Sequence, residues 1–215
     1  MRKTLFSGIA ACLLATAATA AEQSPSVIWT VGQADRSASE FALAPDRFRD
    51  FLANDFGYED KYFLVGHSVP AADFPYVLPG PADTWGGTWP TSGWRTHQVN
   101  ILFGLKEIPS DGTCTLVVDL LDYAKNFLPL VKVSVNTQDA KFQLDAPGLS
   151  VADQRKPNQM EKIVDTLSIT GNLAKATPRR LEIPIRPGVL KAGGNEVTIT
   201  VLEGSWILFD RVSLE

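Results

Sequence analysis

Cysteine, histidine and clustered basic residues are scarce in this chain of 215 residues. It contains two cysteines and two histidines, and its 20 Lys+Arg against 24 Asp+Glu give a formal net charge of −4. Two histidines are too few for a multi-histidine metal site. A mildly acidic chain without a Lys/Arg cluster also lacks the basic stripe that nucleic-acid phosphates require. We therefore expect no nucleic-acid partner.

Common catalytic and cofactor motifs are also missing. The chain has no G-x-S-x-G elbow, no Walker loop, no G-x-G-x-x-G after a strand and no C-x-x-C. Neither His67 nor His97 has an obvious nucleophile nearby in sequence, although a Ser-His-Asp triad is recognised by geometry rather than spacing. Acidic pairs such as Asp119 and Asp122 are too common to indicate a glycosidase, and we interpret both residues as solvated or turn-bonding. The sequence predicts no catalytic residue and favours a function without catalysis.

The apolar run near the N-terminus is too short, and its flanks are wrong, for a membrane span. Residues 1–20 instead have a basic start, an apolar run and a small-residue end, Ala-Thr-Ala, which is the layout of a secretory signal peptide. We therefore predict a secreted or periplasmic protein without a membrane span. Residues 9–12, Ile-Ala-Ala-Cys, also resemble a bacterial lipobox, so a lipid anchor through Cys12 is the alternative.

Removal of the signal leaves residues 21–215, a length typical of a single domain. Cys114 is then the only cysteine, so no internal disulfide is possible. With 45% apolar residues the chain can build a large core without one. Because no basic neighbour lowers the pKa of Cys114, we expect a small buried side chain rather than a reactive thiol.

The mature part contains a succession of short segments with a β-type pattern. Apolar and polar residues alternate clearly in VKVSVN, LEIPIR and EVTITVLE, and turn residues separate the segments. Eight such segments predict an all-β fold, an antiparallel β-sandwich with long loops. The expected strands are residues 26–32, 61–69, 97–105, 114–123, 130–136, 179–186, 195–204 and 205–215.

Two segments depart from this pattern. Residues 37–55 are expected to form one or two helical turns, with Phe41, Phe48, Phe51 and Leu52 facing inward. Residues 154–178 are polar and are expected to form an excursion with a single helical turn. No repeat, low-complexity segment or interdomain linker interrupts the chain, so a single domain remains the prediction.

The most unusual segment is YVLPGPADTWGGTWPTSGWRTHQ, residues 76–98, which resembles neither a helix nor a strand. Flat aromatic rings bind the apolar faces of sugars, and neighbouring polar groups hydrogen-bond the hydroxyls. The prolines in and beside this segment reduce the entropy lost on binding. The sequence therefore predicts a carbohydrate-binding site formed by Tyr76, Asp83, Trp85, Trp89, Trp94, Arg95 and His97.

A structural role is the alternative for this loop. Trp85 and Trp94 would then close one end of the sandwich, and Asp83 would only bond backbone amides in a turn. Trp85 is followed by two glycines, where the chain can turn sharply, so we expect its ring to cover the core. Trp89 precedes a proline, which favours extended backbone, so we expect it to project outward as a stacking surface. Trp94, beside Arg95, fits either role.

The segment VIWTVGQADRSASEF, residues 27–41, resembles the opening of a known module. It is similar to the carbohydrate-binding-module-like β-sandwich of rhamnogalacturonan lyases and related polysaccharide lyase family proteins. Residues 74–87 and 204–215 are similar to later parts of such modules. The resemblance implies a jelly-roll, galactose-binding-like fold and an association with polysaccharide-degrading enzymes. The matching residues of the opening are Trp29, Gly32, Asp35, Ser37, Glu40 and Phe41.

Those enzymes carry the module beside a separate catalytic domain, so the resemblance assigns no catalytic lyase residue to this chain. Our leading hypothesis is a non-catalytic module that binds or helps to present plant-type acidic polysaccharide, with rhamnogalacturonan or pectin as the first candidate. A polysaccharide lyase or glycoside hydrolase, or a piece of one, is the first alternative. A structural module that docks onto a catalytic partner is the second.

The same resemblance suggests a structural calcium ion, which galactose-binding-like sandwiches often hold. Asp35, Glu40 and Asp210 are acids near the expected terminal strands, but the converging oxygens that calcium needs are not evident in the sequence. No other cofactor is expected. Because the two ends of such a module commonly lie close together, Trp29 and Trp206 are expected to be buried in one sandwich.

Overall fold

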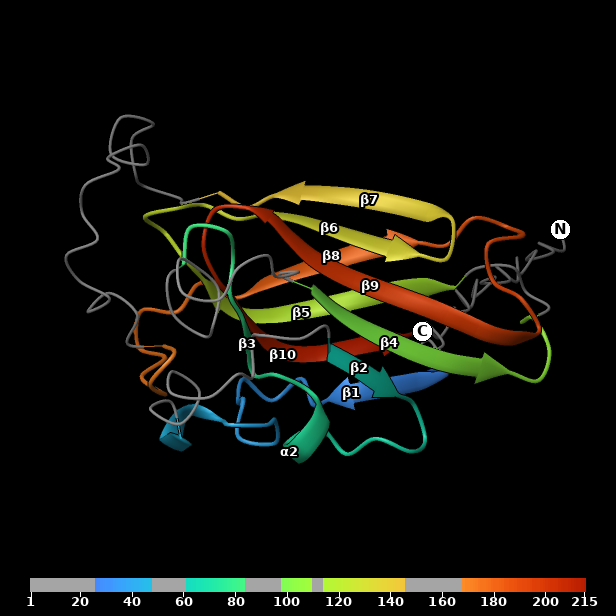
Figure 1. Cartoon of the computed structure of the whole chain (residues 1–215), viewed down its shortest axis with the longest axis horizontal. Helices are drawn as coiled ribbons and strands as arrows, with labels where there is room; N and C mark the ends of the chain where they lie inside the picture. The colour runs from blue at the N-terminus through green and yellow to red at the C-terminus, as the bar shows by residue number, and fades with distance from the viewer. Residues whose placement is uncertain (1–25, 48–60, 84–97, 110–113, 146–167) are drawn as a thin grey trace, which may run out of the picture.

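The computed structural model describes residues 26–47, 61–83, 98–109, 114–145 and 168–215. These residues form two β-sheets that face each other as layers (Figure 1). Sheet I contains β1 (Trp29–Gly32), β10 (Ile207–Leu214), β5 (Thr115–Tyr123) and β8 (Arg179–Pro184) in that order, with β3 (Val77–Leu78) also paired to β10. Sheet II contains β2 (Lys61–Leu64), β4 (Gln98–Leu105), β9 (Gly193–Glu203), β6 (Leu130–Val135) and β7 (Gln138–Gln143) in that order.

The strand pairs are antiparallel, apart from β2 with β4, which are parallel. A parallel pair needs a long crossover, and here the connection passes through α2 (Pro70–Asp73) and β3 of sheet I before it returns. Helical structure in the described residues consists of α2 and the 3-10 turn η1 (Pro45–Arg47). The predicted all-β sandwich is therefore confirmed.

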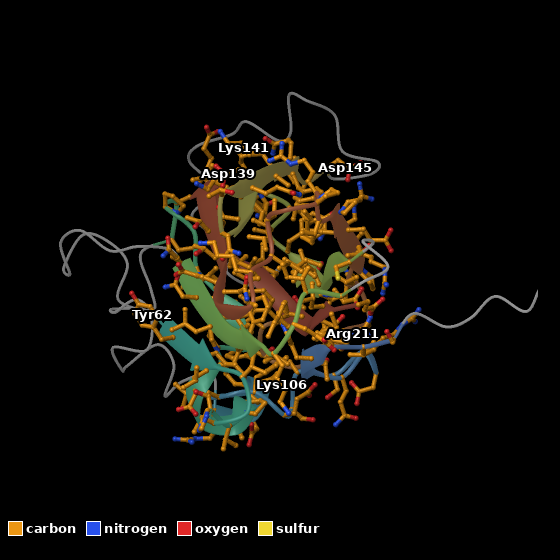
Figure 2. All side chains as sticks on the ribbon, turned by 90° about the vertical axis from the view of Figure 1, so that its right-hand side faces the viewer. Tyr62, Lys106, Asp139, Lys141, Asp145 and Arg211 are labelled. Atoms are coloured by element: carbon orange, nitrogen blue, oxygen red, sulfur yellow. The ribbon has the colours of Figure 1, made fainter. Side chains whose placement is uncertain are left out.

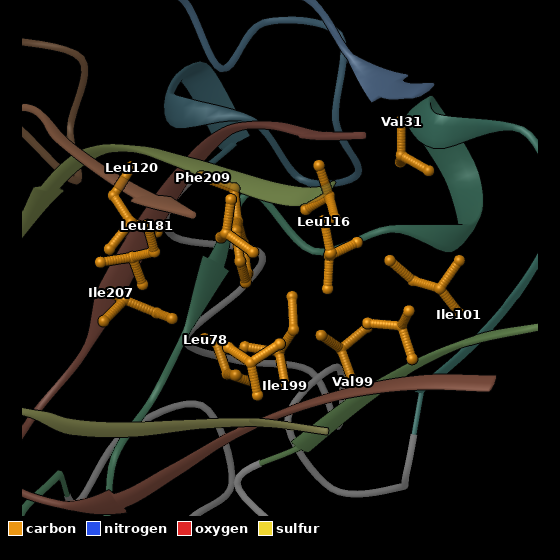
Figure 3. Close-up of a cluster of buried hydrophobic side chains, with 14 of the residues drawn as sticks. Val31, Leu78, Val99, Ile101, Leu116, Leu120, Leu181, Ile199, Ile207 and Phe209 are labelled. Atoms are coloured by element: carbon orange, nitrogen blue, oxygen red, sulfur yellow. The ribbon is translucent and has the colours of Figure 1, made fainter. Parts of the chain in front are cut away.

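The alternating sequence pattern places one face of each sheet in the core. In β6, Val131, Val133 and Val135 are buried and alternate with partly exposed residues, and Val197 and Ile199 of β9 lie opposite the last two of them. Burying each such aliphatic side chain contributes about 1.5–3 kcal/mol. The end-on view in Figure 2 shows side chains filling the space between the layers. Figure 3 shows Val99, Ile101 and Ile199 of sheet II facing Leu116, Leu120 and Phe209 of sheet I.

The two ends of the described sandwich lie side by side, as predicted. Trp29 pairs with Leu214 in the antiparallel β1–β10 ladder. Trp29 is 7% exposed and Trp206 is 4% exposed, which confirms that both are buried. The ring centroids of Trp29 and of Phe103 on β4 lie 5.2 Å apart, so this contact joins the first strand of sheet I to sheet II.

Several predicted boundaries were wrong. The strand expected at residues 61–69 ends at Leu64, because Gly66 has a φ of 83° and the backbone N–H of Leu64 donates to Ser68 Oγ. Strands β3 and β7 were not predicted. Of the helical turns expected at residues 37–55, η1 lies in the described part, where Phe41 is buried as predicted.

Other predictions fall outside the described residues. This group contains the signal peptide, the inward-facing Phe48, Phe51 and Leu52, and most of the 154–178 excursion. Residues 168–178 form turns, and no helix occurs among them. Cys114 is buried at the start of β5, and burial raises the pKa of its thiol, in agreement with the expected inert side chain.

Candidate functional site

Tyr76, the first residue of the predicted carbohydrate site, lies in the core. Its exposed fraction is 0%, and burial raises the pKa of its phenol well above the ordinary value. Its backbone carbonyl accepts a hydrogen bond of 2.9 Å from the N–H of Phe209 on β10. A buried ring cannot present a stacking face to a sugar, so we reassign Tyr76 to the hydrophobic core.

Asp83 is also buried, and its carboxylate bonds the start of the loop. One oxygen accepts from the backbone N–H of Gly80 at 2.7 Å, and the other accepts from the hydroxyl of Ser205. The N–H of Ala82 donates to the carbonyl of Gly204 at 2.8 Å. These bonds correspond to the turn-bonding role that was the alternative for Asp83, and they attach residues 80–83 to the β9–β10 connection.

Glycine is required where these two segments meet. A Cβ on Gly80 would lie 2.5 Å from the carbonyl oxygen of Gly204 and 2.6 Å from that of Ser205. Gly204 itself has a φ of 80°, which other residues rarely adopt. The close backbone approach explains why residue 80 is glycine, and it holds the start of the loop on the sandwich.

Trp85, Trp89, Trp94, Arg95 and His97 lie outside the described residues, so their predicted roles stay predictions. The chain is described again from Gln98, the first residue of β4.

Polar side chains that were not predicted as a site lie on β4 and its neighbour β9. Gln98 Nε2 donates to Asn100 Oδ1 at 2.9 Å, and Thr198 Oγ1 donates to the same oxygen at 3.0 Å. Thr200 Oγ1 donates to Gln98 Oε1 at 3.3 Å. The spacing of Gln98 and Asn100 in QVNILFGL is the sequence signal that could have placed both on one face, but the strand that lies beside them was not evident from sequence.

Asp119 and Asp122 have structural partners. Asp119 contacts Arg180 and Arg211, so it is ion-paired rather than solvated. Asp122 is buried and accepts from Lys125 Nζ at 2.6 Å and from the backbone N–H of Thr177 at 3.0 Å. The expected turn-bonding role therefore describes Asp122 well. The β5–β10 register shifts twice between the Asp122–Leu208 pair and the Asp119–Arg211 pair, so the ladder between the two acids is irregular.

The three acids considered for calcium each bond a backbone amide. Asp35 Oδ1 accepts from Ser37 N at 2.9 Å, Glu40 Oε1 accepts from Gln33 N at 2.9 Å, and Asp210 Oδ1 accepts from Arg36 N at 3.0 Å. Among the described residues, no group of three or more His, Cys, Asp or Glu side chains could hold a metal. These carboxylates therefore do not fit a calcium site by themselves. Bound calcium stays a prediction, which thermal unfolding before and after chelation tests.

Asp210 has an unusual environment for a carboxylate. Burial raises its pKa to about 6, and the nearby negative charges of Asp35 and Asp119 act in the same direction. The N–H of Arg36 opposes the shift because it stabilises the ionised form. Asp210 thus anchors the loop after β1.

In the part of the chain that the structure describes, no helix is long and apolar enough to cross a membrane.

Several solved structures share partial likeness with this chain. A family GH115 4-O-methyl-α-glucuronidase with specificity for decorated arabinogalactans is 16% identical, with a TM-score of 0.33 over 55% of this chain and 13% of that chain. The cycloalternan-forming enzyme of Listeria monocytogenes is 16% identical, with a TM-score of 0.31 over 54% of this chain and 8% of that chain. A ruminal GH26 endo-β-1,4-mannanase is 15% identical, with a TM-score of 0.31 over 67% of this chain and 26% of that chain.

This chain therefore spans between 8% and 26% of the lengths of these proteins. With TM-scores this low, the likenesses support no conclusion about function. No curated protein matches the chain.

A family model matches far more of the chain than any of these structures. The model describes a CBM-like domain, domain III of polysaccharide lyase family 4, and it matches residues 27–214. That range begins before β1 and ends with the last residue of β10, so it includes both sheets of the sandwich. The resemblance noted in the sequence is thereby confirmed, and the chain belongs to the CBM-like family of polysaccharide lyase family 4, domain III.

Proposed function

We propose that this chain is an exported, non-catalytic module that binds plant-type acidic polysaccharide, with rhamnogalacturonan or pectin as its ligand. The family match carries the proposal, because the model of a carbohydrate-binding-module-like domain matches residues 27–214, which include the whole sandwich. The module acts with a catalytic domain or a partner enzyme that degrades the same polymer. Export follows from the signal-like residues 1–20.

The anchored ends of residues 76–98, which we call the aromatic loop, support this proposal. Asp83 and Gly80 hold one end on the β9–β10 connection, and Gln98 begins β4 at the other end. The prolines in and beside this segment lower the entropy that is lost on binding. Trp89 is the residue that we expect to stack on a sugar ring, with Arg95 and His97 as hydrogen-bond partners.

Glycan-array binding of the purified chain, combined with an activity assay on pectic substrates, tests the function. We expect binding to acidic pectic glycans and no cleavage. Cleavage would establish the lyase or hydrolase alternative, and the absence of any glycan binding would leave the docking module as the better explanation. The N-terminal sequence of the exported protein tests the signal, because a lipoprotein would instead begin at a modified Cys12.

Two tryptophan variants test the loop separately from the fold. Trp85→Ala should lower the free energy of unfolding by about 3–5 kcal/mol if its ring covers the core. Trp89→Ala should leave the unfolding curve almost unchanged and weaken glycan binding. Unfolding of the Trp89→Ala variant, or unchanged glycan binding by it, would show that the loop is a structural cover.

A further inference from the structure

The outer face of sheet II carries polar or aromatic side chains in two adjacent rows across its strands. Each row follows the strand register from one strand to the next, so its members are direct cross-strand neighbours. We call this surface the Asn100 face. The first row is Tyr62, Asn100, Thr198, Ser134 and Asp139, and the second is Gln98, Thr200, Lys132 and Lys141.

The core side chains of the same strands establish that these rows point outward. Phe63, Val99, Ile101, Val133 and Ile199 alternate with the row members along the strands and are all buried in the core. Successive side chains of a strand point to opposite faces of the sheet. The nine row members therefore share the outer face of sheet II, from β2 at one edge of the sheet to β7 at the other.

The centre of the Asn100 face has an unused hydrogen-bond donor. Asn100 Oδ1 accepts from both Gln98 Nε2 and Thr198 Oγ1, which fixes the orientation of the amide. Asn100 is 1% exposed, and its Nδ2 has no hydrogen-bond partner in the structure of the described residues. Leaving a buried donor unpaired is costly, and such groups in native proteins commonly have a water or ligand partner. A water or ligand oxygen that reaches Nδ2 would supply the missing acceptor and remove this cost.

One edge of the face carries an aromatic ring open to solvent. Tyr62 on β2 is 57% exposed, although it is cross-strand neighbour to the buried Asn100. An exposed ring beside a buried polar group combines a flat apolar surface with a hydrogen-bond donor. This is the pairing that a sugar ring with its hydroxyls requires.

The opposite edge carries an excess of positive charge. Lys132 on β6 and Lys141 on β7 are direct cross-strand neighbours, an arrangement of like charges that costs stability. Asp139 lies 3.4 Å from Lys132, and a hydrogen bond from Ser134, followed by the two lysines, lowers the pKa of its carboxyl. The three ionised side chains leave one positive charge at this edge. In a chain with a net charge of −4, a local cation pair favours an anionic ligand.

We propose that the Asn100 face is a binding surface for an acidic oligosaccharide whose chain runs across the strands. A sugar ring stacks on Tyr62, hydroxyls bind at Asn100 and its polar neighbours, and a uronate carboxylate binds Lys141 and Lys132. This inference rests on the proposed function and assigns it a place outside the aromatic loop. Figure 2 labels Tyr62 at one edge of sheet II and Asp139 with Lys141 at the other.

The width of the sheet fits such a ligand. Neighbouring strands lie about 4.8 Å apart, so the path from β2 to β7 over four strand spacings is about 19 Å long. An extended oligosaccharide can therefore contact Tyr62 and the lysines at the same time only if it spans several sugar units. A monosaccharide would reach one edge alone and bind weakly.

Titration calorimetry with three oligosaccharides of equal length tests this assignment. The probes are de-esterified hexagalacturonate, its methyl-esterified form and a neutral galactan oligosaccharide. The variants are Tyr62→Ala and Lys141→Glu, with Ile108→Ala and Lys106→Glu as matched controls, because both control residues are exposed and lie beyond β4, outside the two rows. Thermal unfolding checks that each variant is folded. If Tyr62→Ala is not folded, Tyr62→Leu is used in its place.

The parent chain should bind the de-esterified hexamer about tenfold more tightly than the ester. Lys141→Glu should abolish that preference, whereas Tyr62→Ala should weaken both forms about tenfold. The two controls should bind as the parent does. If the parent binds and neither variant changes binding, the Asn100 face is not the site, and the proposed function stands. If only Lys141→Glu is without effect, the uronate assignment is wrong. If the parent binds none of the probes, this inference fails, and the proposed function then depends on binding to rhamnogalacturonan in the glycan array.

Discussion

The two outer faces of the sandwich both present polar residues, but they complete their hydrogen bonds differently. On sheet I, Arg211, Asp119 and Arg180 are cross-strand neighbours on β10, β5 and β8. Asp119 accepts from Arg211 Nε at 2.9 Å and from Arg180 Nη1 at 3.2 Å. Arg211 Nη2 also lies 3.1 Å from Glu215. We call this surface the Asp119 face; Figure 2 shows Arg211 on the opposite side of the molecule from Tyr62.

The Asp119 face alternates charges of opposite sign, so its ions satisfy one another. The Asn100 face has two lysines that share one acid, Asp139, and a buried amide whose donor has no partner within the described part of the chain. Matched charges stabilise the fold and leave little capacity for a ligand. Unmatched groups cost stability, and a ligand can recover that cost by binding them. The comparison therefore indicates that polar residues on a sheet do not identify a binding surface, whereas incomplete pairing does.

Removal of Asp119 should produce the largest change in stability among the tests of this comparison. Asp119→Ala leaves Arg211, which is mostly buried, without its closest partner. Because a hydrogen bond between charged groups contributes about 1.5–3 kcal/mol, we expect the free energy of unfolding to fall by about 2 kcal/mol. Urea denaturation measures the change. Oligosaccharide binding should be unaffected, since the other sheet carries the proposed site.

Asp145→Ala is the matched control for that variant. Asp145 lies 3.2 Å from Arg179, and both side chains are exposed. Exposed ion pairs contribute about 0–1 kcal/mol, so this variant should lose much less stability. Equal losses for the two variants would contradict the view that the Asp119 face is a closed stabilising network.

Asp210, which precedes Arg211 on β10, should give an effect that depends on pH. Its pKa in the folded protein is raised from 3.8 to about 6 by burial, so the folded state holds a proton that the unfolded state has released. The contribution of Asp210 to the free energy of unfolding is therefore fully present at low pH. It is lost as the pH rises from the unfolded-state pKa to the folded-state pKa. Relative to Asp210→Asn, the parent should become less stable between about pH 4 and pH 7. A difference that stays constant over this interval in urea denaturation would show that Asp210 does not titrate as described.

The sequence predicted the core better than it predicted the surfaces. Alternation identified the strands that bury valine and isoleucine, because the period of the apolar residues is a local property of the chain. Strand β7, with the sequence QDAKFQ, was missed because it lies at a sheet edge and most of its side chains are polar. The Asn136-Thr137 pair before it, where Asn136 has a φ of 49°, was the available signal of a two-residue hairpin turn.

The site residues were harder to predict because binding surfaces depend on register. Tyr76 and Tyr62 are each followed by an apolar residue, yet one is fully buried and the other is largely exposed. The row that joins Gln98 to Thr200 and Lys132 connects residues up to 102 positions apart. No pattern within one strand shows which strand will lie beside it or in which alignment. The family resemblance indicated carbohydrate binding, but it did not place the surface.

The smallest expected change in stability comes from Thr200→Val on the Asn100 face. The Thr200 hydroxyl donates to Gln98 Oε1 over a long distance of 3.3 Å, and both residues are only partly buried. Valine has nearly the same shape, so the free energy of unfolding should change by less than about 0.5 kcal/mol. Binding of de-esterified hexagalacturonate should still weaken about two- to fivefold, because the face loses a hydroxyl and the orientation of Gln98.

Thr30→Val provides the matched control on the other face. Thr30 projects outward from β1, and its hydroxyl donates to the carbonyl of Gly32 at 3.2 Å. The substitution removes the same chemical group and a bond of similar length, so its effect on unfolding should equal that of Thr200→Val. It should leave hexagalacturonate binding unchanged, because sheet I carries no part of the proposed surface. Equal weakening of binding by both variants, measured by calorimetry, would remove the distinction between the two faces.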